Sequence, residues 1–79
     1  MNTLADRWVY DCVLENPTTG ERRPITVELT AEERNDSLRQ REPVGGRDGP
    51  VAKGWALRRA TIMAPEGFIP IVEVTLRTP

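Results

Sequence analysis

The residue types that most often perform catalysis are scarce in this chain of 79 residues. It has no histidine, which excludes Ser-His and Cys-His catalytic pairs, histidine-ligated metals and the usual general base near neutral pH. The single cysteine, Cys12, excludes an intrachain disulfide and a structural zinc site within one chain. We interpret Cys12 as a small buried hydrophobic residue, because it falls on the apolar side of a predicted strand. We therefore expect a protein that is not an enzyme and holds no cofactor and no metal.

A stretch rich in glycine invites a phosphate-binding interpretation, because exposed backbone N–H groups can hold an anion. Residues 42–54 contain four glycines and two prolines. The glycines do not follow the Gly-x-Gly-x-x-Gly spacing, and Lys53 is not followed by the Ser or Thr of a Walker A motif. The stretch also follows a predicted helix rather than a strand. We interpret residues 42–54 as a long, flexible connecting loop.

Two pairs of carboxylates are candidates for a general acid and general base. Glu32 and Glu33 are adjacent, and adjacent helix residues point apart, so capping of a helix explains them better. Asp11 and Glu28 lie on two strands that we expect to pair, but nothing in the sequence supplies a pocket around them. We interpret all four as solvated surface charges.

One basic and aromatic cluster remains, formed by Arg47, Lys53, Trp55, Arg58 and Arg59. Arginine beside an exposed tryptophan could clamp a phosphate backbone and stack a base. The same residues are favoured contacts of protein interfaces. A third interpretation buries the tryptophan and leaves the arginines in solvent. The net charge of −1 argues against nonspecific nucleic-acid binding, which calls for a basic domain.

The first half of the chain predicts two strands followed by a helix. Residues 7–15 and 22–30 alternate between apolar and polar residues around a turn at residues 16–20. The side predicted to face the core carries Trp8, Tyr10, Cys12, Leu14, Ile25, Val27 and Leu29. We expect residues 1–6 to be a frayed lead-in with at most one helical turn. The sequence Thr30-Ala-Glu-Glu33 is a capping box, so a helix should run from Ala31 to about Arg41. Its only aligned apolar residues are Ala31 and Leu38, which predicts a weakly anchored helix.

The most hydrophobic part of the chain is its last third. Residues 55–64 and 68–77 are two apolar runs that flank the turn Pro65-Glu66-Gly67, which is typical of a β-hairpin. Pro70 indicates an edge position or a bulge in the final strand.

The expected fold is one small α+β domain over residues 1–79, in the order β-β-α-β-β. Its centre is a four-stranded antiparallel sheet with one short helix. The strands carry apolar residues on both sides, and a single poorly apolar helix cannot cover both. Either the sheet curls into an SH3-like half-barrel, which is the alternative fold, or a second chain covers what is left exposed.

The charges are unevenly distributed along the sequence. Residues 1–36 carry four bases and eight acids, a net charge of −4, whereas residues 37–79 carry seven bases and four acids, a net charge of +3. Two copies could meet through acidic and basic faces, or the folded sheet could interleave the segments and cancel the difference.

The functional expectation is a protein–protein interaction or accessory domain that forms a homodimer through its sheet. The expected contacts are Trp55, Arg58, Arg59, Phe68, Ile69 and Ile71. The alternative is a nucleic-acid-binding domain that uses residues 47–59, with contacts from Arg47, Lys53, Arg58 and Arg59. The absence of a signal-peptide pattern and of a long apolar run predicts a cytoplasmic protein without a membrane partner. Ten arginines against one lysine suggest a GC-rich bacterial or phage genome.

Overall fold

The protein is described here by a computed structural model that covers residues 7–77, apart from the side chains of residues 72 and 73. The expected lead-in, residues 1–6, lies outside the described residues. The elements in chain order are β1 (Val9–Glu15), β2 (Arg22–Glu28), α1 (Ala31–Leu38), α2 (Pro50–Met63) and β3 (Ile69–Leu76).

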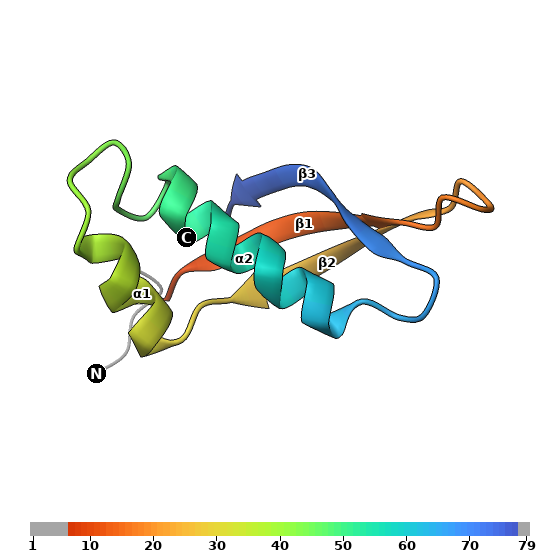
Figure 1. The fold of residues 1–79 in the computed structure, drawn as a ribbon, viewed down its shortest axis with the longest axis horizontal. Coiled ribbons are helices and arrows are strands. Elements are labelled where there is room, and N and C mark those ends of the chain that lie inside the picture. The colour runs from red at the N-terminus through yellow and green to blue at the C-terminus, as the bar shows by residue number, and fades with distance from the viewer. Residues whose placement is uncertain (1–6, 78–79) are drawn as a thin grey trace.

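The strands form an antiparallel sheet in the order β2-β1-β3, and α2 crosses one side of this sheet (Figure 1). The prediction of a small α+β domain with an antiparallel sheet is confirmed. The sheet stays open, with β2 and β3 as its two edges, and a helix rather than a curled-over sheet covers its apolar side. The chain therefore does not form the SH3-like half-barrel of the alternative.

The predicted strand at residues 55–64 is wrong, because this segment belongs to the helix α2. Pro50 occupies the first turn of that helix directly after the cap residue Gly49, a position where its missing N–H costs nothing. Ala52, Ala56 and Ala60 recur every four residues, and all three are fully buried. The described sheet thus has three strands instead of four, and two helices accompany it.

The turn at Pro65-Glu66-Gly67 is present, but it joins α2 to β3 instead of two strands. The Phe68 N–H donates to the Pro65 carbonyl at 3.0 Å. Gly67 has a φ of 89°, a conformation that other residues rarely adopt. The predicted C-terminal hairpin is therefore a helix, a tight turn and a strand.

The core lies between the sheet and α2. The side of the first strand that was predicted to be buried is buried, with Tyr10, Cys12 and Leu14 at most 3% exposed. Burial also raises the pKa of the Cys12 thiol, which fits its interpretation as an unreactive core residue. Because the facing side chains of α2 are alanines, the helix backbone can approach these larger residues closely.

Helix α1 begins as predicted and is anchored differently. The Thr30 hydroxyl accepts a hydrogen bond from the Glu33 N–H at 3.2 Å, and the Glu33 carboxylate accepts one from the Thr30 N–H at 2.8 Å. The helix ends at Leu38, which is 59% exposed, so the expected apolar anchor is wrong. Its buried residue is Ser37, whose hydroxyl donates to the Gly46 carbonyl at 3.0 Å.

The loop between the helices is shorter and more tightly packed than predicted. It ends at Gly49, because residues 50–54 already belong to α2. A Cβ atom on Gly45 would lie 2.2 Å from the Gln40 carbonyl oxygen, so no other residue fits there without movement. The Tyr10 hydroxyl donates to the Arg47 carbonyl, which fastens the loop to β1. The loop is thus a packed part of the domain.

Candidate interaction surfaces

The structure divides the predicted partner-binding residues between two sides of the molecule. Trp55, Arg58 and Arg59 lie on α2, whereas Ile69 and Ile71 lie on β3 and point away from that helix. Phe68 packs against the core. The predicted hairpin would have brought these residues together. Because residues 55–64 belong to a helix instead, the residues lie on two different sides of the molecule.

The tryptophan side of α2 is occupied by contacts within the chain. Trp55 lines a groove of about 550 Å³ between α1 and α2, and its indole N–H donates to the Asp36 carboxylate at 2.8 Å. The Arg58 guanidinium lies 5.4 Å from the centre of the Trp55 ring, where the ring attracts the cation. The polar and aromatic groups of this groove are therefore largely satisfied by one another.

Glu33 and Arg59 form the most enclosed ion pair of the groove. Their side chains approach to 2.9 Å, and Glu33 is only 13% exposed. Burial alone would raise the pKa of Glu33, but hydrogen bonds from Thr30 and Arg59, with the charge of Arg59, outweigh it and hold the pKa below its ordinary value. The pair joins α1 to α2.

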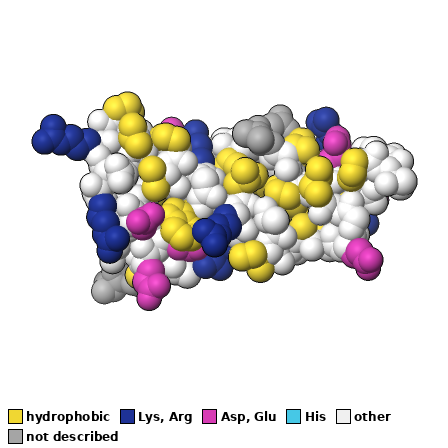
Figure 2. Space-filling view, in the orientation of Figure 1, with side chains coloured by type: hydrophobic (Ala, Val, Ile, Leu, Met, Phe, Trp, Pro, Cys, Tyr) yellow, Lys and Arg dark blue, Asp and Glu magenta, His cyan; other side chains and the backbone are white. Residues whose placement is uncertain are grey.

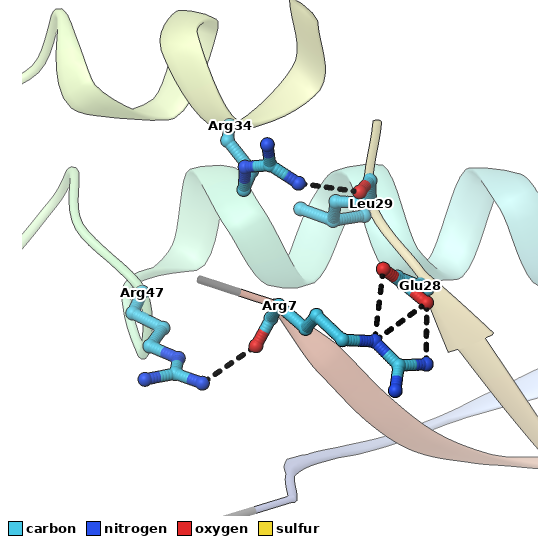
Figure 3. A network of polar contacts seen from close by, with 5 residues as sticks. All are labelled: Arg7, Glu28, Leu29, Arg34 and Arg47. Atoms are coloured by element: carbon cyan, nitrogen blue, oxygen red, sulfur yellow. Dashed lines mark hydrogen bonds and ion pairs between the residues drawn. The ribbon is translucent and has the colours of Figure 1, made fainter. Parts of the chain in front are cut away.

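The residues predicted to contact nucleic acid do not form a continuous basic surface. Lys53 pairs with Asp48 at 3.1 Å, and Arg59 pairs with Glu33. Arg47 turns toward β1 and donates to the Arg7 carbonyl at 2.6 Å (Figure 3). The view of the side that α2 occupies also shows hydrophobic side chains interspersed among the basic ones (Figure 2). These contacts reduce the support for a phosphate-binding surface.

The opposite side of the sheet has no helix over it among residues 7–77. The buried alanines of α2 face Tyr10, Cys12 and Leu14, so the alternate residues of β1 point the other way. We call this side the helix-free face. Its residues are Arg7, Val9, Asp11, Val13, Glu15, Arg22, Pro24, Thr26, Glu28, Ile69, Ile71, Thr75 and Arg77.

One cross-strand row of the helix-free face is apolar. Val13 pairs in register with Pro24 on one side and with Ile71 on the other. Ile69 extends this apolar strip along β3 and is 52% exposed. The strip crosses all three strands, so it is a property of the sheet and not of one element.

Ion pairs lie at both ends of the apolar strip. At one end, Arg7 contacts Glu28 at 2.8 Å (Figure 3), and Arg77 contacts Asp11 at 2.7 Å. The hydrogen bond from Arg77, with a smaller one from Thr26, holds the pKa of Asp11 below its ordinary value. At the other end, Arg22 contacts Glu15 at 3.0 Å. The positive and negative charges of this face are therefore paired.

The sequence analysis found only part of this surface. It noted apolar residues on both sides of the strands, which is the signal for an exposed apolar strip. It did not find the pairing of Arg77 with Asp11, since 66 positions separate the two residues. This pair and that of Arg59 with Glu33 join the acidic first half to the basic second half, as the interleaved arrangement of charges requires.

The described residues hold no group of three or more potential metal-binding side chains. No helix within residues 7–77 has the length and apolar character needed to cross a membrane. Comparison of the chain with protein families, curated proteins and solved structures finds no match. A functional proposal must therefore come from the surfaces of this protein.

Proposed function

We propose that the protein is a non-enzymatic interaction module that associates with a second copy of itself through its sheet. The supporting observation is the one-sided layering of the domain. Helix α2 covers one side of the sheet, and the other side presents Val13, Ile69 and Ile71 without a covering element among residues 7–77.

The small size of the chain gives this association a physical reason. A domain of this length buries only about 60–65% of the surface of its unfolded chain, so its own core supplies limited stability. Covering an apolar strip with a second protein surface removes further apolar area from water, at roughly 25 cal/mol per Å². Association through the sheet would cover the apolar strip on the side of the sheet that α2 does not cover.

The nucleic-acid alternative has weaker support. It depends on Arg47, Lys53, Arg58 and Arg59, and each of these side chains already contacts a protein group. The net charge of −1 also gives little attraction for a phosphate backbone. We therefore expect no oligonucleotide binding at low salt.

Light scattering on a size-exclusion column tests the proposed association. The protein should be loaded over a hundredfold range of concentration at low and at moderate salt. We expect the weight-average mass to rise with concentration from the monomer mass of 8.9 kDa. A mass that stays at the monomer value at every concentration would contradict the proposal.

Two matched variants identify the side of the molecule that is used. Ile69→Glu places a charge on the sheet, and Ile62→Glu places the same charge on α2, where the isoleucine is 79% exposed. Both positions are exposed, so both variants should fold. We expect Ile69→Glu to abolish the rise in mass and Ile62→Glu to leave it unchanged. The reverse pattern would move the interface to the helices.

A further inference from the structure

A sheet can associate with a second sheet either through its helix-free face or through one of its two edge strands. Resting on the proposed function, we infer that the contact is made by the helix-free face, which stacks on the same face of a second copy. The outer edges of β2 and β3 do not pair with a strand of the second copy. Three features of the described residues lead to this inference, and a fourth sets the strength of the contact.

The first feature is the poor quality of the β2 edge as a pairing strand. Pro24 lies in the middle of this strand and has no N–H to donate to an added strand. Arg22 and Arg23, which precede it, are both exposed and charged. Proline and charged residues on an edge strand are features that prevent pairing with another chain.

The second feature is the irregularity of the β3 edge. Pro70 lies in this strand, and its neighbours depart from a regular register. Thr75 pairs with Asp11 and Ile71 pairs with Val13, so three residues of β3 stand opposite one residue of β1. Such a bulge bends the strand and disrupts its ladder of hydrogen bonds. A straight strand of a second chain would not match this edge.

The third feature is the charge balance of the helix-free face. Its three arginines, Arg7, Arg22 and Arg77, each contact a carboxylate of the same face, so these three pairs carry no net charge. Two identical faces can therefore approach each other without net repulsion, which a strongly acidic or basic face could not do. A two-fold axis, the commonest symmetry of homodimers, would place one apolar strip on the other.

The fourth feature is the size of the face, which sets the strength of the contact. Strands about 4.8 Å apart with a rise of about 3.3 Å per residue give a sheet of about 14 by 23 Å. This is well below the area of about 800 Å² per partner that a stable interface buries. We therefore expect a weak, reversible dimer whose dissociation constant is high enough for the monomer to predominate in dilute solution. Because the charges are already paired within each copy, salt should change this constant little.

Nuclear magnetic resonance of the wild-type chain tests this inference as the protein concentration rises. We expect the methyl resonances of Val13, Ile69 and Ile71 to shift in a saturable way, while those of Ile62 on α2 stay in place. Amide hydrogen exchange should be measured on the same samples. Stacking through the face leaves exchange at the outer edges of β2 and β3 unchanged, whereas pairing through an edge protects the outward amides of one strand.

The outcomes separate this inference from the proposed function. New protection along β2 or β3 would overturn the face as the interface and leave self-association standing. Resonances that do not change at any concentration would overturn both. As a second test, Val13→Glu changes the central strand, which lies at neither edge. We expect it to weaken dimerisation by at least about tenfold, since a charge would be buried in the apolar strip. Unchanged dimerisation of this folded variant would also overturn the inference.

Discussion

The two sides of the sheet are built from alternate residues of the same strand and have opposite designs. On the side that α2 covers, Tyr10, Cys12 and Leu14 are buried against small alanine side chains. On the helix-free side, Val13 stays partly exposed and the charges occur as pairs. The covered side depends on the fit of large side chains of β1 against small side chains of α2. The other side combines an apolar strip with ion pairs that carry no net charge. This difference is the basis of the proposed contact through the helix-free side.

The largest expected difference between the two sides comes from shortening neighbouring residues of β1. Leu14→Ala removes a buried side chain and should cost about 3 kcal/mol of unfolding free energy. Val13→Ala removes a partly exposed side chain and should cost about 1 kcal/mol or less. Urea denaturation at low protein concentration measures both. Equal costs would mean that the two sides are not distinct in the monomer.

Glycine substitutions test how tightly the loop between α1 and α2 is packed. Gly45→Ala should cost about 2 kcal/mol or more, because the new methyl group would collide with the Gln40 and Ser37 carbonyl oxygens. A mild effect, measured by thermal denaturation, would show that the loop is as loose as its composition suggests.

Gly54 provides the matched control on the exposed side of α2. A Cβ atom there would meet nothing within 4 Å, so Gly54→Ala should stabilise the protein by about 0.5–1 kcal/mol. A loss of stability in this variant would contradict the placement of Gly54 in an exposed helical turn.

The ion pair between Glu33 and Arg59 gives a pH-dependent contrast. The pKa of Glu33 is lower in the folded chain than its ordinary value of 4.5. The ionised Glu33 therefore stabilises the folded protein fully above pH 4.5, and this contribution to the unfolding free energy is lost as the pH falls through the folded pKa. Glu33→Gln keeps a side chain that can complete the capping box, and it should cost about 1 kcal/mol at neutral pH. Unfolding free energies measured from pH 7 to pH 3 should converge for the two proteins. A difference that persists in acid would exclude the charge as its cause.

The smallest effect is expected for the exposed pair on the helix-free face. Arg77→Ala breaks the contact with Asp11, but both side chains are largely solvated, so the unfolding free energy should change by no more than about 0.5 kcal/mol. The effect should shrink further in high salt. A large loss of unfolding free energy, measured by denaturation in dilute solution, would mean that the ion pairs of this face stabilise the fold of the single chain.

Local signals in the sequence predicted the first half of the fold well. The alternation in residues 7–15 and 22–30 and the capping box at Thr30 act over a few residues, so they could be recognised without knowing the rest of the chain. The helix at Pro50–Met63 was missed because its apolar residues resemble those of a strand. The proline at its first turn and the alanines spaced by four were the signals that could have revealed it.

The candidate surface was only partly predictable, for a physical reason. Its apolar strip is visible as the two-sided pattern of the strands. Its charge pairing depends on strand register, which brings Arg77 beside Asp11 across 66 positions. The bulge in β3 shifts that register, and no local pattern in the sequence fixes its place.

Small-angle X-ray scattering over a concentration series tests association through the helix-free face most directly. The monomer has a Cα radius of gyration of 13.1 Å and extents of 40 × 26 × 18 Å, with the helix layer and the sheet stacked roughly along the shortest axis (Figure 1). A second copy stacked on the helix-free face should raise the Cα radius of gyration to about 16 Å once the dimer is fully formed. We expect this rise in the wild-type protein and no rise in Val13→Glu, whose new charge lies on the face and on neither edge strand. A radius that stays at the monomer value in the wild type, or one that rises equally in Val13→Glu, would contradict the account.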